Sequence, residues 1–252
     1  MTQAVEFIDI AWAGRPVRIE HQWIARDKTH APLMVFLHEG LGSISMWRDF
    51  PQRVCEAAGC RGLVYSRPGY GRSTPRPVEE ALNTDFMHRQ AQEVLPALLD
   101  ALGVDTATDK PWLLGHSDGG SIALLYAAHF AQRIAGAIVL APHILVEDLS
   151  VSSIAKARTA YLETDLRQRL SRHHDDPDSA FWGWNDIWLR PDFRHWSIEY
   201  EISAIACPLL AVQGLDDAAR VGERLKVEAG WENAVEGALG QLIEAVLVDA
   251  PE

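Results

Sequence analysis

The chain contains 252 residues, 48% hydrophobic and 23% charged, so it can build a full core, and its length suits one α/β domain. The net charge of −12 argues against a nucleic-acid partner, because an acidic surface repels phosphate. No apolar run approaches a membrane span, and the first residues do not resemble a secretion signal. The cysteines show no metal-site spacing, and reduced thiols in a cytoplasmic protein are the simplest interpretation of Cys55, Cys60 and Cys207.

Strand and helix patterns alternate along most of the chain. Alternating apolar residues predict a β-hairpin at a sheet edge over residues 5–12 and 17–24. Short apolar runs predict buried parallel strands at residues 33–37, 62–65, 112–114, 135–140 and 208–212. Apolar residues at helical spacing predict helices at residues 47–58, 84–102 and 122–130. This alternation favours a right-handed, mostly parallel α/β sheet.

The pattern changes over residues 143–206, which hold four of the nine tryptophans and no buried-strand run. This stretch predicts a helical insertion. Its aromatic residues either line an apolar substrate pocket or form the insertion's own core, and core packing is the default for Tyr161, Phe181, Trp182, Trp184, Trp188 and Trp196. Residues 173–176 (His-His-Asp-Asp) suggest either a metal site or a solvated polar loop, of which the loop is the simpler interpretation.

A G-x-S-x-G pattern stands at Gly115-His116-Ser117-Asp118-Gly119. It follows a predicted strand and precedes a predicted helix, which is the context that a nucleophile elbow requires. Glycines on either side of Ser117 permit the cramped turn that lifts the hydroxyl clear of the sheet. The start of a helix behind the serine favours negative charge at an attacked carbonyl. A chance Gly-Ser turn is the alternative, and the placement favours the elbow.

Together with this elbow, three further segments resemble loops of the α/β-hydrolase superfamily, and the resemblance covers residues 1–217. Residues 38–42 (His-Glu-Gly-Leu-Gly) resemble the oxyanion loop, although Glu39 stands where the family usually has glycine. Residues 66–73 (Ser-Arg-Pro-Gly-Tyr-Gly-Arg-Ser) resemble the loop after strand four, and residues 214–217 (Gly-Leu-Asp-Asp) resemble the acid loop.

The resemblance implies an α/β-hydrolase core over residues 1–142 and 207–217, with residues 143–206 as a helical cap. It also implies attack by Ser117 on an acyl carbon of a small-molecule substrate, without a cofactor or a metal. Asp217 would be the triad acid, with Asp216 as its rival. The oxyanion hole would be formed by backbone N–H groups of Asp118 and of Gly40 or Leu41.

The expected base is missing from its usual place. The chain order in this superfamily is serine, acid, histidine, yet every histidine lies at or before His195. Serine is a poor nucleophile without a base, so we expect low or lost activity. His143, directly after a predicted strand, is a possible substitute base, as are His38 and His116. Structural roles are the alternatives: His38 would brace its loop, His116 would pack under the elbow, and His143 would line the entrance to the cap.

Residues 218–252 do not resemble a hydrolase C-terminus. Their Gly-Trp-Glu-x-Ala-Val-Glu-x-x-Leu-Gly pattern resembles the stretch entering the hinge of bacterial structural-maintenance-of-chromosomes ATPases. We therefore expect a chimera, through a gene fusion or an error of reading frame or assembly; a divergent hydrolase tail is the alternative. An apolar stripe in the tail favours self-association, through Val235, Ala238, Leu239, Leu242 and Val246.

These patterns lead to one functional hypothesis and one alternative. The hypothesis is a serine hydrolase that acts on an ester or a similar acyl substrate through an acyl-enzyme on Ser117, with a C-terminal part that is incomplete or replaced. The alternative is a catalytically inactive protein of the same fold or a fusion product. The fold does not select the substrate.

Overall fold

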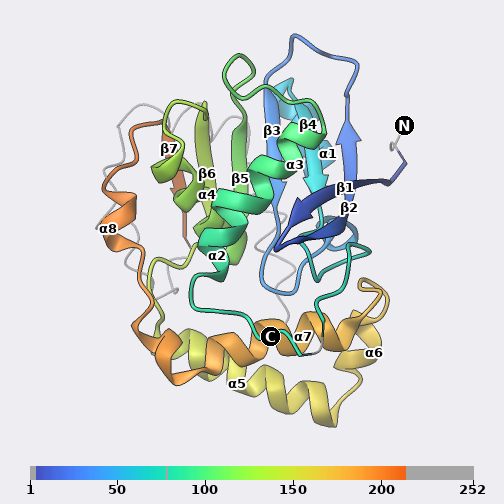
Figure 1. The fold of residues 1–252 in the computed structure, drawn as a ribbon, viewed down its shortest axis with the longest axis vertical. Helices are drawn as coiled ribbons and strands as arrows, with labels where there is room; N and C mark the ends of the chain where they lie inside the picture. Colours follow the sequence, from blue (N-terminus) through green and yellow to red (C-terminus); the bar gives the residue numbers. More distant parts are fainter. Residues whose placement is uncertain (1–3, 78, 214–252) are drawn as a thin grey trace.

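Runs of consecutive apolar residues become the central strands, because both faces of these strands are covered. The computed structural model describes residues 4–77 and 79–213. Its strands form a seven-stranded sheet in the order β1-β2-β4-β3-β5-β6-β7 (Figure 1). β1 and β2 form an edge hairpin, β2 is antiparallel to β4, and the other neighbours are parallel. The strands are β1 (Glu6–Trp12), β2 (Arg15–Ile24), β3 (Leu33–Leu37), β4 (Arg61–Tyr65), β5 (Trp112–His116), β6 (Gly136–Leu140) and β7 (Leu209–Val212).

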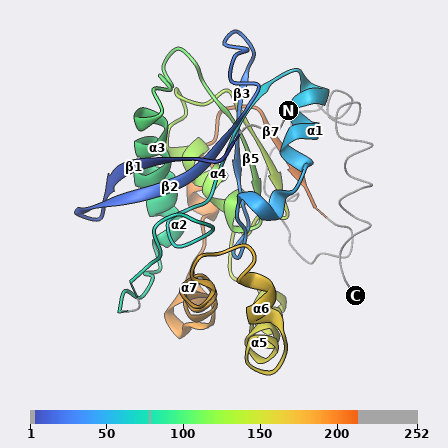
Figure 2. The same cartoon turned by 90° about the vertical axis from the view of Figure 1, so that its right-hand side faces the viewer.

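Helices cover both faces of this sheet, with α1 on one face and α2, α3 and α4 on the other (Figure 2). The α-helices are α1 (Phe50–Ala58), α2 (Phe86–Arg89), α3 (Leu95–Ala101), α4 (Asp118–His129), α5 (Asp148–Glu163), α6 (Leu166–Leu170), α7 (Pro177–Leu189) and α8 (Glu199–Ile202). Short 3-10 helices, η1 (Ile44–Trp47) and η3 (Pro191–His195), connect them. The mostly parallel α/β architecture and the edge hairpin are as the sequence predicts.

The alternation of side chains along β3 divides the core into two parts. Leu33, Val35 and Leu37 pack with the helices on the α4 side, whereas Met34 and Phe36 pack on the α1 side. All five are buried. Successive residues of a strand point to opposite faces, so a five-residue apolar run serves both cores. This arrangement anchors the loop after β3, which carries the predicted oxyanion residues.

The predicted helix over residues 84–102 is present as a continuous helical segment over residues 86–101, but a π-helical turn lies inside it. The segment is α2, then a π-helical turn η2 (Gln90–Val94), then α3. Pro96 lies at the start of α3 and has no N–H to donate to the preceding turn. The chain widens to a π-turn just before it, a known response of helices to a broken hydrogen-bond ladder.

The segment after β6 is helical, as predicted, and α5, α6 and α7 lie together beyond one end of the sheet (Figures 1 and 2). Phe181 is fully buried, and Tyr161 stacks on it with ring centroids 3.7 Å apart in a cluster of the segment's own residues. Packing in the insertion's own core, the default interpretation, therefore holds for these two. Trp188 is also fully buried, but it packs in the main core of the sheet and its helices. Among the described residues, no helix combines the length and the apolar character that crossing a membrane requires.

Candidate active site

Ser117 occupies a strained turn between β5 and α4. Its backbone angles are φ 52° and ψ −120°, a region that non-glycine residues rarely adopt and that clusters at functional sites. The neighbouring glycines allow the chain to pass. A Cβ on Gly119 would lie 2.1 Å from the carbonyl oxygen of Leu37, and a Cβ on Gly115 would lie 2.2 Å from that of Gly119. The G-x-S-x-G spacing is therefore required sterically, and the geometry is that of an elbow.

Replacing Gly119 with alanine should destabilise the protein by about 3 kcal/mol, because the added methyl group meets rigid backbone rather than a movable side chain. For a domain of this size the melting temperature should fall by about 6–12 °C, which calorimetry measures. Gly183→Ala is the matched control, since that helical glycine faces the end of the Arg76 side chain. Equal shifts in the two variants would contradict the steric argument.

His143 is the histidine that the structure brings to Ser117. Its Nε2 lies 3.1 Å from Ser117 Oγ, within hydrogen-bonding distance. The backbone of His143 is held by Ser121, whose hydroxyl accepts from the His143 N–H at 3.1 Å and donates to its carbonyl at 2.5 Å. The imidazole also contacts the edge of Trp188, with ring centroids 4.7 Å apart. Of the two roles left open by the sequence, this position favours the substitute base.

His38 braces the loop after β3, as one of its two interpretations predicts. Its Nδ1 donates to the Glu39 carbonyl at 2.7 Å, and its Nε2 accepts the Arg67 N–H at 3.0 Å. The two bonds fix the neutral tautomer, and burial, together with the Arg67 charge, holds the pKa of His38 well below its usual value. A neutral imidazole with both nitrogens occupied does not serve as a base for Ser117.

Arg67 supports the same loop from the loop after β4. Its Nη2 donates to the Glu39 carbonyl at 2.8 Å, so that carbonyl accepts bonds from His38, from Arg67 and from the Gly42 N–H. The peptide that follows is trans, and its N–H, which belongs to Gly40, therefore points to the opposite side. This geometry orients a predicted oxyanion donor away from Arg67.

The second predicted donor, Asp118, begins α4, where the first N–H groups of a helix have no acceptor within the helix. Its side chain and that of Arg67 are each 1% exposed, and the carboxylate lies 4.0 Å from Arg67 Nη2. Burial raises the pKa of Asp118, while the Arg67 charge opposes that shift. Arg67 also lies 4.7 Å from the centre of the Tyr70 ring. Sequence reasoning did not assign Arg67 a role, although it noted its loop.

His116 does not pack under the elbow, and that interpretation is wrong. Its side chain is 44% exposed, and its Nδ1 lies 3.6 Å from a carboxylate oxygen of Glu39. Burial alone would raise the pKa of Glu39, but the interaction with the His116 side chain lowers it to about 2. The glutamate that replaces the family's usual glycine is thus a charged group directly beside the elbow.

The expectation of a solvated loop at residues 173–176 is wrong for His174, which is buried. Its Nε2 donates to the Leu41 carbonyl and its Nδ1 accepts the Gly71 N–H, both at 2.9 Å. The helical segment therefore touches the predicted oxyanion loop directly. Trp184 does the same, because a Cβ on Gly40 would collide with its indole. Within the described ranges, no three potential metal ligands of the His, Cys, Asp and Glu types are grouped.

Several predicted features fall outside the described residues. They are Asp216, Asp217, the tail at residues 218–252 and its apolar stripe. The triad acid and self-association through the tail therefore stay predictions. The three cysteines are free thiols, and Cys55 and Cys60 are buried on the α1 side of the sheet.

Comparison with known proteins shows the family of this chain and relatives of two different kinds. The profile of the alpha/beta hydrolase fold matches residues 32–196, nearly two thirds of the chain. The chain is 29% identical over 113 residues to 2-succinyl-6-hydroxy-2,4-cyclohexadiene-1-carboxylate synthase of Salmonella agona (strain SL483), a match that covers 45% of this chain and 39% of that protein.

A 43-residue segment is 79% identical to the chromosome partition protein Smc of Xanthomonas oryzae pv. oryzae (strain KACC10331 / KXO85), covering 17% of this chain and 4% of that protein. The matches thus span far less than two thirds of either relative. The high identity of so short a segment supports the interpretation of the chain as a chimera.

A solved structure of carboxylesterases from the thaumarchaeon Nitrososphaera gargenis superposes with a TM-score of 0.67 at 15% identity. The match covers 96% of this chain and 100% of that one. At this identity the likeness establishes the fold and nothing further.

Proposed function

Since the chain belongs to the α/β-hydrolase fold family, we propose that it hydrolyses carboxylic esters or related acyl compounds through an acyl-enzyme on Ser117. The observation that carries the proposal is the strained elbow with His143 Nε2 at 3.1 Å from the serine hydroxyl. A nucleophile and a base within hydrogen-bonding reach are what acyl transfer requires.

The reaction would proceed in two steps. Ser117 Oγ attacks the carbonyl carbon while His143 takes its proton, and His143 then protonates the departing alcohol to leave the acyl-enzyme. Water attacks that ester and loses a proton to His143, which returns it to the departing Ser117 Oγ, so that the acid leaves and the serine hydroxyl is restored. His143 begins and ends each cycle in the same protonation state.

The developing oxyanion would be held by the backbone N–H groups of Asp118 and of Gly40 or Leu41. The support for Gly40 is the orientation of its peptide, which His38 and Arg67 impose from the opposite side. Each such donor is worth about 3–4 kcal/mol in related chemistry. The helical segment would act as the cap, because His174 and Trp184 already contact this loop.

We place turnover below the enzyme median of about 10 s⁻¹. His143 follows β6, whereas the family's base follows the acid in the chain. A histidine at another position in the chain lacks the contact with the acid that normally orients the base. Because the members of a triad act as a unit, this loss should lower turnover.

A fluorophosphonate tests the nucleophile, because it forms a stable bond only with an activated serine. The intact protein should gain one phosphonyl group, detected by mass spectrometry, and Ser117→Ala should gain none. Ser203→Ala is the matched control, since Ser203 is exposed and donates only to the nearby Tyr200 carbonyl. Labelling that persists in Ser117→Ala would show that another residue is the nucleophile. An unlabelled wild-type protein would favour the inactive alternative. Either outcome would refute the proposal.

A further inference from the structure

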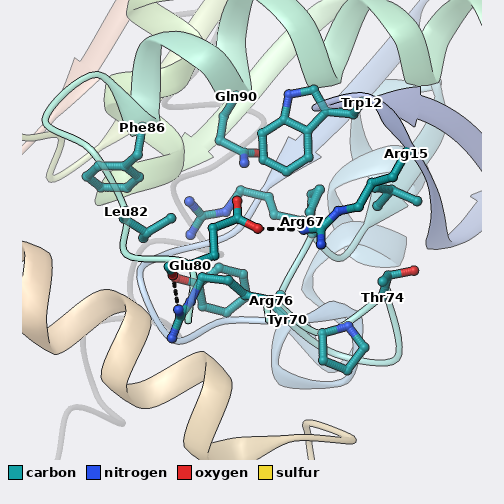
Figure 3. Close-up of a pocket in the computed structure, with 14 residues that line it drawn as sticks. Trp12, Arg15, Arg67, Tyr70, Thr74, Arg76, Glu80, Leu82, Phe86 and Gln90 are labelled. Atoms are coloured by element: carbon teal, nitrogen blue, oxygen red, sulfur yellow. Dashed lines mark hydrogen bonds and ion pairs between the residues drawn. The ribbon is translucent and has the colours of Figure 1, made fainter. Parts of the chain in front are cut away.

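A small cavity with both apolar and charged lining residues lies between the β1–β2 hairpin, the loop after β4 and the π-turn η2, and it has a volume of about 30 Å³. Figure 3 shows Arg15, Arg67 and Glu80 converging on this space, with Arg76 below them and Gln90 above. The volume accommodates about two water molecules or one small ion.

The cavity is lined by hydrogen-bonding groups that lack partners. Among the residues that the structure describes, the Nε atoms of Arg15, Arg67 and Arg76 are buried without an acceptor. The side-chain oxygen of Gln90, on η2, is also unpaired, and this residue is 6% exposed. Buried donors without partners cost about 1–3 kcal/mol each. The Nε of Arg76 lies against Gly183 of α7, so the Nε atoms of Arg15 and Arg67 are the two that indicate a ligand that accepts hydrogen bonds.

The charges around the cavity do not balance. Arg15 pairs with the Glu80 carboxylate at 2.7 Å, and Arg67 lies 4.0 Å from Asp118. The guanidinium of Arg76 donates to the carbonyl oxygens of Pro77 and Glu80, which are neutral acceptors. The lining thus holds three cations and the Glu80 carboxylate, while Asp118 lies beside Arg67 outside the lining. With both carboxylates counted, the excess is one positive charge.

We propose that this cavity binds one small monovalent anion, either a halide or the carboxylate group of a larger acid. The single excess charge selects a monovalent ion, and the volume excludes a phosphate ester or a whole substrate. Guanidinium groups bind carboxylates through paired N–H donors, and Glu80 shows that a carboxylate is accepted at this place. This site goes beyond ester hydrolysis and does not depend on Ser117.

Thermal unfolding in sodium acetate, sodium chloride and sodium phosphate at equal ionic strength tests the proposal. An anion at ten times its Kd should raise the melting temperature by about 3–6 °C in a saturable manner. Arg15→Gln and Arg76→Gln should abolish that shift. Arg158→Gln is the control for a lost surface charge, because Arg158 pairs with Asp186 on the exposed side of the helical segment, and it should retain the shift.

The salts separate the two sources of the anion. Saturation by chloride that removes any further response to acetate identifies a halide site, whereas a response to acetate in saturating chloride identifies a carboxylate site. Bromide soaked into crystals would locate a halide by anomalous scattering. Shifts of the same size in Arg15→Gln and Arg158→Gln, or no saturable shift in either monovalent salt, would overturn the proposal. Ser117→Ala should show the same anion-dependent shift, so this test does not depend on whether the hydrolase proposal is correct.

Discussion

Changing His143 to glutamine should lower kcat/KM for p-nitrophenyl acetate by about 10²–10⁴-fold, the contribution that a positioned general base makes. Glutamine can keep a hydrogen bond to Ser117 Oγ but cannot take its proton. The substitution preserves most of the side-chain volume against Trp188, so the fold should survive. The absorbance of the released nitrophenolate measures the change in kcat/KM.

His129→Gln is the matched control for that experiment. His129 is exposed at the end of α4, where it contacts Phe130, and its loss should leave kcat/KM within twofold of wild type. If the two variants are equally active while Ser117→Ala is inactive, another group accepts the serine proton and the role of His143 is wrong. Melting temperatures of both variants exclude unfolding as the cause.

Replacing Arg67 with methionine should destabilise the protein by about 3–5 kcal/mol at neutral pH, because it leaves the buried Asp118 carboxylate without its cation. The Glu39 carbonyl loses one of its three donors as well. Burial already raises the pKa of Asp118, and removal of the guanidinium raises that pKa further.

The sign of the pH dependence follows from that shift. A carboxyl group whose folded pKa lies above its unfolded value binds more protons in the folded state, so stability falls as pH rises. The deficit of Arg67→Met should therefore be largest above the folded pKa of Asp118 and should shrink as the pH is lowered. Urea unfolding at several pH values measures it. Arg67→Met with Asp118→Leu should recover part of the loss; a double variant as unstable as the sum of both changes would contradict the coupling.

The sheet could be predicted because its strands are short apolar runs between glycine-rich turns. Leu33–Leu37 reads as a buried strand and is one over the same residues. The π-turn at Gln90–Val94 could not be predicted from periodicity, because the apolar residues around Pro96 keep helical spacing on either side. The proline was visible, but its effect depends on whether packing retains the flanking turns.

The candidate site was likewise predictable only in part. Ser117 could be found because its elbow needs glycines at fixed local spacing, and the structure shows the backbone carbonyls that they avoid. The contact between Ser117 and His143 joins residues that follow two neighbouring strands, β5 and β6, and the sequence offered His143 only as one of several histidines. The burial of His174 depends on loops about 100 and 130 residues away in the chain, which no local pattern encodes.

The bridging position of His174 also bears on the stiffness of the molecule. One rigid imidazole ring spans the loops after β3 and β4, and each of its 2.9 Å bonds is lost when the atoms separate by roughly another angstrom. Ser45 and His173 add a parallel contact at 2.9 Å. Sliding of the helical segment over the two loops would break these bonds together, so it is a stiff motion. Because the two loops continue directly from β3 and β4, bending at the ends of residues 143–206 would break the same bonds, so the helical segment is fastened to the sheet at this point.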